Sequence, residues 1–391
     1  MKYSYLLLGL TLAMLQASPM TAQTEADSTQ KEKRFEVHGT LRAKYEYEPE
    51  INKNRFQVRN ARVSIEGKVI KAIGYKAEID LSDQGQMRML DAYVKVTPVS
   101  HLDFQIGQMR VPFSIDAHRS PHVQYFANRS FIAKQVGDVR DVGAMLAYHI
   151  KPARLKLSAG IFNGAGITSQ KEWHKTVNYS AKAEWNFVPR FNLVVSSQTI
   201  KPEQTRIWLH DAGLNYDDGR WHAEAEYLYK HYADNAFDDV HAFNVFGTYT
   251  LPLRRLLQGI QFLVRYDYMS DHSDGTTYQT EAGKPHLLEL SDYERGRLTG
   301  GITLIPQKIS NTAIRLNYEK YFYRHDSHPD PSERDKAVVE FMYTFNRYSR
   351  PIPFDFCVTL QTTEETADAG AAMRRRTTLL PPHSFRKYSD L

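Results

Sequence analysis

The chain has 391 residues, of which 42% are hydrophobic, 12% aromatic and 24% charged, and its formal net charge is +5. This composition excludes a disordered chain, and the lack of any run of about 20 apolar residues after position 22 excludes a bundle of membrane helices. The small net charge argues against a nucleic-acid-binding protein, and the single cysteine, Cys357, excludes an intramolecular disulfide.

The amino terminus has the pattern of a secretory signal peptide. Lys2 gives a positive start, and residues 6–15 form an apolar stretch that is too short to span a bilayer. We place the cleavage after Ala22, so residues 1–22 are the predicted signal peptide and residues 23–34 a polar lead-in. The pattern therefore predicts export.

From residue 35 onward hydrophobic and polar residues alternate, which is the period of a strand with two different faces. In the first segment Leu41 and Tyr45 lie on one face, and Arg42 and Lys44 lie on the other. Turn signals divide the region into sixteen predicted strands: 35–48, 55–69, 74–82, 88–97, 102–110, 140–150, 154–163, 178–188, 191–200, 206–216, 220–231, 239–251, 258–269, 291–305, 312–324 and 335–345. An even number of alternating strands predicts an all-β fold, a 16-stranded antiparallel transmembrane β-barrel over residues 35–345.

The connections between the predicted strands alternate between short and long, as they do in outer-membrane barrels with short periplasmic turns and long outer loops. The longest, residues 111–139, follows the fifth strand. A secreted β-sandwich or a β-solenoid would also alternate. The apolar faces are rich in Tyr, Phe and Trp near strand ends, however, which favours the aromatic girdles of a membrane barrel.

Several short motifs carry a resemblance to a known family. They are DAYV at 91–94, GQMRVPFS at 107–114, NRS at 128–130, RDVG at 140–143 and IFNG at 161–164. In this order and spacing they resemble the phosphate-selective porin O and P family. The resemblance implies a 16-stranded trimeric porin in the outer membrane of a Gram-negative bacterium. It also implies that the loop after the fifth strand folds into the barrel as a constriction.

A pore that prefers anions needs Arg or Lys along its path, and Arg suits phosphate because its planar fork donates two bonds at once. The loop and its flanks supply the candidate constriction and anion-binding residues: Arg110, Arg119, Arg129, Lys134 and Arg140. The polar strand faces supply a candidate basic ladder in the lumen: Arg42, Arg62, Lys76, Arg265 and Arg315.

Carboxylates occupy the same faces and could neutralise these cations. Subtracting Lys2 and the seven basic and five acidic residues of 346–391 leaves a net charge of only +2 for the barrel. Three interpretations therefore stay open: a specific phosphate pore, a modestly anion-preferring or general pore for small hydrophilic solutes, and a pore for a different polar solute.

The last predicted strand ends on aromatic residues, with Val339, Phe341, Tyr343 and Phe345 on one face. In the family that the chain resembles, such a strand ends the protein and serves as the assembly signal. Here residues 346–391 follow. We interpret them as a poorly ordered periplasmic tail, or as a reading-frame product without a role.

Two other classes of function compete with a porin. A barrel enzyme that hydrolyses lipid or peptide assembles its site in space, so a sequence pattern cannot exclude it; no nucleophile motif stands out, and we expect no enzymatic activity. A surface adhesin predicts long apolar or repetitive outer loops, which the sequence lacks.

No cofactor or metal ion is expected. Stretches rich in Asp, Glu and His at 234–241 and 325–335 could bind a divalent cation through oxygen ligands, but solvated loop charge is the better explanation. The expected partners are outer-membrane lipid, small anions or other hydrophilic solutes, and two further copies of the chain in a homotrimer, with no nucleic acid.

Overall fold

The computed structural model describes most of the region in which strands are predicted. The described residues are 35–83, 86–137, 139–167, 170–201, 205–273, 277–279, 285–287, 294–307, 309, 311–324, 329 and 331–349. The predicted signal peptide, the polar lead-in and nearly all of the predicted tail lie outside them.

The described residues form eighteen strands and four short 3-10 helices. The strands are β1 (Phe35–Glu48), β2 (Lys53–Ile70), β3 (Ile73–Asp83), β4 (Gln86–Val99), β5 (Leu102–Arg110), β6 (Arg140–Ile150), β7 (Leu155–Phe162), β8 (Asn178–Val188), β9 (Phe191–Ile200), β10 (Ile207–Asp217), β11 (Trp221–Tyr232), β12 (Val240–Pro252), β13 (Leu257–Met269), β14 (Thr277–Gln279), β15 (Pro285–Leu287), β16 (Arg295–Pro306), β17 (Thr312–Tyr323) and β18 (Lys336–Ser349). The helices are η1 (Pro121–Val123), η2 (Ile132–Lys134), η3 (Ala233–Asn235) and η4 (Pro331–Glu333).

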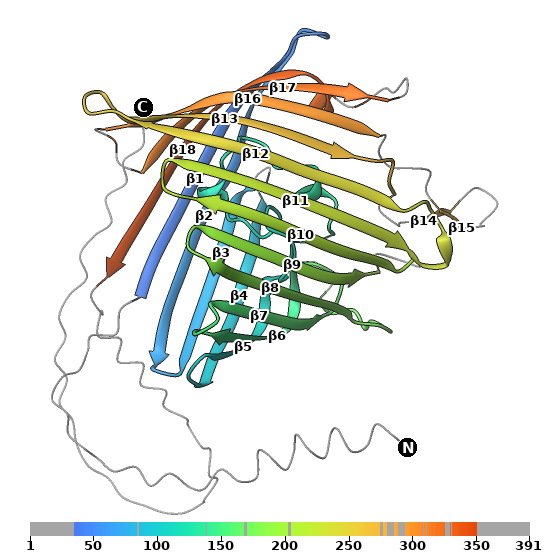
Figure 1. The fold of residues 1–391 in the computed structure, drawn as a ribbon. Coiled ribbons are helices and arrows are strands. Elements are labelled where there is room, and N and C mark those ends of the chain that lie inside the picture. The colour runs from blue at the N-terminus through green and yellow to red at the C-terminus, as the bar shows by residue number, and fades with distance from the viewer. Residues whose placement is uncertain are drawn as a thin grey trace, which may run out of the picture. The chain divides into compact units, whose positions relative to one another are not determined.

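All strands except β14 and β15 form one closed antiparallel barrel, in which each strand pairs with its neighbours along the chain (Figure 1). The barrel closes where β1 pairs with β18, with Phe35 opposite Ser349 and Leu41 opposite Tyr343. The predicted 16-stranded antiparallel barrel is confirmed.

The strand boundaries differ from the predicted ones most clearly at two places. β16 begins at Arg295 rather than at 291, and β18 runs to Ser349 rather than to 345. β18 is longer because residues 346–349 pair with the first residues of β1, so the first residues of the predicted tail belong to the barrel wall. The small β14–β15 sheet lies in a connection that we predicted as a loop.

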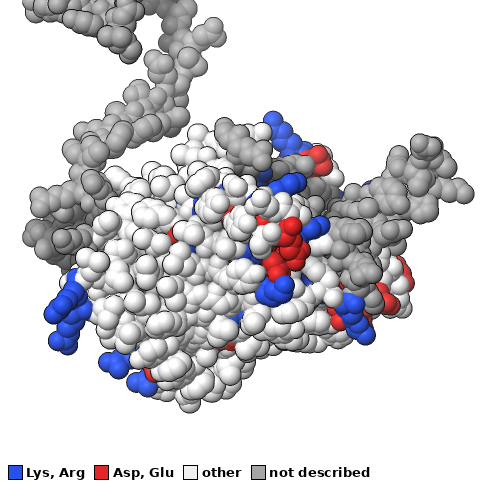
Figure 2. All heavy atoms as spheres, turned by 90° about the horizontal axis from the view of Figure 1, so that it is seen from above, with Lys and Arg blue, Asp and Glu red and all other residues white. Residues whose placement is uncertain are grey.

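Exposure alternates along the strands as the sequence pattern requires. On β10 the Trp208 side chain is 42% exposed, whereas Asp211 on the other face is 2% exposed. Figure 2 shows a mostly white surface with few charged side chains, between basic residues at the left edge and a mixed basic and acidic group towards the right. Apolar residues therefore cover most of the outside of the barrel, and most charged residues of the strands face inward.

The barrel has two different ends. Turns of a few residues, such as 71–72 and 189–190, join the strands at one end, which we call the short-turn end. The connections after β5, β7 and β13 lie at the opposite end, which we call the long-loop end. Among the described residues no helix is long and apolar enough to cross a membrane.

Candidate pore constriction

The connection after β5, residues 111–139, lies against the inner face of the barrel, and we call it the constriction loop. Its apolar side chains, including Phe113, Phe131 and Ile132, form a buried cluster with inward-facing apolar residues of the wall, such as Leu209 and Leu228. The wall residues of this cluster come from β10 to β13 and β17. Burial of apolar surface thus holds the loop to one side of the lumen.

Glu226 on β11 fixes the beginning of the loop. Its Oε1 accepts hydrogen bonds from Ser114 Oγ at 2.6 Å and from the amide of Ile115 at 2.6 Å, and it also accepts a longer one from the amide of Asp116. A carboxylate that accepts several such bonds is a strong local anchor.

Asp116 fixes the middle of the loop. Its Oδ2 accepts hydrogen bonds from Ser130 Oγ at 2.7 Å and from the Ser130 amide at 2.9 Å, and its Oδ1 accepts one from Arg119 at 3.0 Å. Burial alone would raise the pKa of Asp116, but Arg119, Arg129 and Ser130 together lower it to about 2. The carboxylate therefore stays charged well below neutral pH.

Three residues of the predicted basic ladder hold the loop rather than line an open path. Arg42 Nη1 donates to Gln124 Oε1 at 2.6 Å, and its guanidinium also pairs with Glu340 at 2.6 Å. Arg315 pairs with the same Glu340 and donates to the Gln124 carbonyl.

Arg265 has the same role on β13. It donates to the carbonyl of Asn128 at 3.0 Å and pairs with Asp267 at 2.8 Å. These three arginines thus each pair with a carboxylate of the wall and donate hydrogen bonds to the constriction loop.

Sequence reasoning missed the most deeply buried arginine of this wall. Arg297 on β16 donates to the carbonyl of Arg129 at 2.7 Å and pairs with Asp267 at 2.9 Å, and its guanidinium lies 4.6 Å from the centre of the Phe131 ring. Arg295, two residues earlier, also faces inward. Both are an even number of residues before Thr299 in the predicted strand 291–305, so they lie on the same face of that strand. The alternation of the strand could therefore have identified both arginines as lumen-facing.

The opposite wall carries the other two ladder residues and Arg140, each paired with acids. Arg62 Nε lies 2.8 Å from Asp80. Lys76 lies 3.4 Å from Glu78, and Arg140 bridges Glu78 at 2.9 Å and Asp91 at 2.6 Å.

The remaining candidate constriction residues do not all lie together. Arg119 points to β11, where it pairs with Glu224 and lies over the rings of Tyr125 and Phe246. Lys134 lies at the end of the loop and pairs with Glu333, in the connection before β18, at 2.5 Å.

Arg110 and Arg129 differ from every cation described above. Arg110 Nη1 donates to the carbonyls of His118 and Arg119 at 3.0 and 3.3 Å, and Arg129 donates to the carbonyls of Asp116, Ala117 and Arg119 at 2.8 to 3.0 Å. Within the described part of the chain, no carboxylate oxygen lies within ion-pair distance of either guanidinium. Burial lowers the pKa of Arg129 to about 10, and Asp116 opposes this shift, so Arg129 carries its charge at neutral pH.

Three cavities of the described barrel lie on the side of the lumen formed mainly by β1 to β9, and two of them border the constriction loop. One of about 320 Å³ is lined by Arg62, Lys76 and His122, and one of about 460 Å³ at the short-turn end is lined by Lys156 and Glu184. A third, of about 500 Å³, is lined by residues of the loop and of strands β6 to β9. We call the part of the lumen that these three cavities outline the open lane.

Comparisons with known proteins agree with this geometry. Residues 34–191, which contain β1 to β8, match the model of the family described as phosphate-selective porin O and P. The chain is an outer-membrane porin. The predicted resemblance is thereby confirmed, and so is the predicted location in the outer membrane of a Gram-negative bacterium.

Solved structures with the same barrel include OmpF of Salmonella typhi, at 13% identity and a TM-score of 0.57, covering 80% of this chain and 97% of that one. An anion-selective porin from Comamonas acidovorans has 10% identity and a TM-score of 0.57, with 80% and 100% covered. OmpT of Vibrio cholerae, in a trimer form, has 12% identity and a TM-score of 0.55, again with 80% and 100% covered. At these identities the structures show that the fold is shared. No curated protein matches the sequence.

In this porin the four candidate assembly residues lie on the outer face of β18. Val339, Phe341 and Tyr343 are exposed there, and the Phe345 ring covers Gly39 on β1, where a Cβ would lie 2.0 Å from its Cε1 atom. Glycine at position 39 thus leaves the space that the last aromatic side chain fills. Their role in assembly stays a prediction.

Proposed function

We propose that this porin is a passive channel for small hydrophilic solutes that prefers anions, and that Arg110 and Arg129 set the preference. The observation that supports this proposal is the absence, in the described residues, of a carboxylate partner for either guanidinium, although every other candidate cation has one. In a narrow path between low-dielectric walls an uncompensated charge acts on a passing ion more strongly than it would in bulk water.

The preference is expected to be modest. Arg62, Lys76 and Arg140 line the open lane, but Glu78, Asp80 and Asp91 lie within ion-pair distance of them. The fields of such paired opposite charges largely cancel each other. Salt screens what remains beyond about 8 Å at physiological ionic strength.

Neutralising the two arginines tests the proposal. R110Q and R129Q, alone and together, should each lower the chloride-to-potassium permeability ratio by a few-fold, measured from the reversal potential in a salt gradient. R324Q removes a charge from an exposed arginine that pairs with Glu294, and it should leave the ratio unchanged. A double variant with the wild-type ratio would overturn the proposal.

Within the anions, phosphate is the substrate that we propose. Within the described residues Arg110 donates only through Nη1 and Arg129 only through Nη1 and Nη2, so each guanidinium keeps unused N–H groups. A planar fork of this kind can bind phosphate bidentately. Phosphate should then block chloride current at low concentration in the wild type and much less in the R110Q/R129Q variant. Equal block in both proteins, or no block in either, would contradict phosphate binding at these two arginines.

We also propose that the protein acts without hydrolytic activity and as a homotrimer. The family and the fold are those of channels, and OmpT of Vibrio cholerae, which shares the barrel, is described in a trimer form. Liposome swelling without hydrolysis of lipid or peptide would support the first point, and chemical crosslinking to three chains the second. Hydrolysis by the purified protein, or a monomer at all concentrations, would contradict them.

A further inference from the structure

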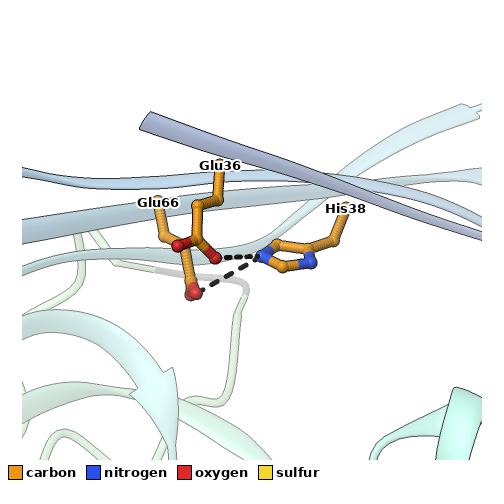
Figure 3. Close-up of side chains that lie close together, drawn as sticks. All are labelled: Glu36, His38 and Glu66. Atoms are coloured by element: carbon orange, nitrogen blue, oxygen red, sulfur yellow. Dashed lines mark ion pairs between the residues drawn. The ribbon is translucent and has the colours of Figure 1, made fainter. Parts of the chain in front are cut away.

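We propose that Glu36, His38 and Glu66 bind one divalent transition-metal ion, such as Zn²⁺, at the short-turn end of the lumen. Glu36 and His38 come from β1 and Glu66 from β2, and their side chains converge on one point (Figure 3). The site is separate from Arg110 and Arg129, so the inference does not depend on the anion preference.

The distances between the donor atoms fit a tetrahedral ion. His38 Nε2 lies 3.4 Å from Glu36 Oε2 and 3.3 Å from Glu66 Oε1, and all three donor atoms lie within 4.8 Å of one another. Ligands at about 2.0 to 2.1 Å from a tetrahedral zinc are separated by about 3.3 Å from each other. The side chains therefore need little movement to coordinate an ion between them.

The histidine is held in the form that a metal needs. Its Nδ1 lies 3.0 Å from Oδ1 of Asn346, on β18. An amide oxygen can only accept, so in the neutral imidazole the proton is on Nδ1 and the lone pair is on Nε2. Nε2 is buried and has no hydrogen-bond partner among the described residues, and it faces two carboxylates, which accept hydrogen bonds when they are ionised. A cation between the three groups would satisfy all of them, and Asn346 would orient the imidazole as the outer partners of metal-binding histidines do.

The local charge favours a divalent ion. Glu36 lies directly opposite Glu66 in the β1–β2 register, and like charges in this position repel each other. Lys76 lies opposite Glu66 on the other side, but its Nζ pairs with Glu78 and Asp91. With the imidazole as a neutral ligand, the two carboxylates carry a charge that one divalent ion balances.

The donor set points to the class of ion. One imidazole nitrogen and two carboxylate oxygens suit Zn²⁺ and its neighbours in the first transition row, whereas Mg²⁺ and Ca²⁺ prefer oxygen alone. The cavity of about 320 Å³ that contains His38 and Glu66 gives access from the open lane and room for water in the remaining coordination position.

A second histidine shows which geometry would not bind an ion. His222 also lies between two carboxylates, but it approaches Asp217 through Nδ1 at 3.2 Å and Glu224 through Nε2 at 3.5 Å. The two ring nitrogens point in different directions, so no single ion could contact all three groups.

Calorimetric titration of the folded porin with Zn²⁺ tests the inference. The wild type should bind one Zn²⁺ per chain at this site at submillimolar concentration, and H38Q and E66Q should each lose that equivalent. N346A keeps all three ligands and should bind about 10- to 100-fold more weakly. H149Q is the matched control, because His149 is another histidine near the short turns that faces one carboxylate, Asp103, at 3.6 Å, and its removal should leave binding unchanged.

The heat-modifiable band on gels would show that each variant is folded. Wild-type protein that binds no Zn²⁺, or a folded H38Q variant that binds as many equivalents as the wild type, would overturn the inference. Zn²⁺ added at the short-turn end should also shift the reversal potential towards anions in the wild type and in R110Q/R129Q, but not in H38Q.

Discussion

Arg42 and Arg110 both reach the interior of the barrel, but only Arg42 has a carboxylate beside it, Glu340 at 2.6 Å. The alternation of the strand places Arg42 in the lumen without further information. It does not reveal that Glu340, nearly three hundred residues later, is its partner. The sequence therefore predicts which cations face the lumen, whereas their division into anchors and free charges depends on contacts between distant segments.

Among single residues, Glu226 makes the clearest contribution to the shape of the pore. In E226A the hydroxyl of Ser114 and the amide of Ile115 lose their acceptor, and an unsatisfied buried donor costs about 1–3 kcal/mol. We expect the constriction loop to loosen, so that single-channel current becomes larger or noisier. D103N, near the short turns, should not change the current. An E226A channel with wild-type conductance and noise would contradict the anchoring role.

Asp116 predicts a pH dependence. Its pKa of about 2 lies below the ordinary value of about 3.9 in an unfolded chain, so its stabilising contribution is complete above the unfolded value and is lost as the pH falls towards 2. The contribution amounts to about 2–3 kcal/mol. The difference in the free energy of unfolding between the wild type and D116N should therefore be constant from pH 7 to about pH 5. It should then shrink between about pH 4 and pH 2, and a difference that disappears well above pH 4 would contradict the burial and pairing of Asp116.

At the scale of elements, the positions of the strands follow from local information. The period of two residues and the turn residues are both written in short stretches, so most predicted strands begin and end within a few residues of those observed. The side of the lumen that the constriction loop covers was not predicted. Its signal lies in apolar residues at lumen-facing positions, such as Ile207 and Leu209, which an aqueous channel would not need.

The end of β18 gives a prediction for truncated chains. Residues 346–349 pair with the first residues of β1, so a chain that ends at Ser349 keeps the complete β1–β18 ladder. We expect it to show the heat-modifiable folded band at wild-type yield. A chain that ends at Phe345 keeps the aromatic residues but loses four pairs, and it should assemble with a lower melting temperature. Failure of the Ser349 chain to assemble would show that residues beyond the barrel are required.

At the scale of the whole molecule, net charge is a poor guide to ion selectivity. The barrel, residues 35–349, carries a net charge of only +3, which is the +2 of residues 35–345 and the charge of Arg347, yet this small excess is not spread evenly. Carboxylates neutralise the candidate cations on the covered wall and in the open lane, whereas Arg110 and Arg129 contact carbonyl oxygens and no carboxylate among the described residues. Position rather than total charge is expected to set the preference.

The most direct measurement of this claim is the zero-current potential of single wild-type channels between unequal concentrations of potassium chloride. We predict the sign that corresponds to chloride passing more easily than potassium, and a smaller value at high ionic strength because salt screens exposed charges. A potential of the opposite sign would mean that the carboxylates of the open lane dominate the path, and it would contradict the role that we assign to Arg110 and Arg129.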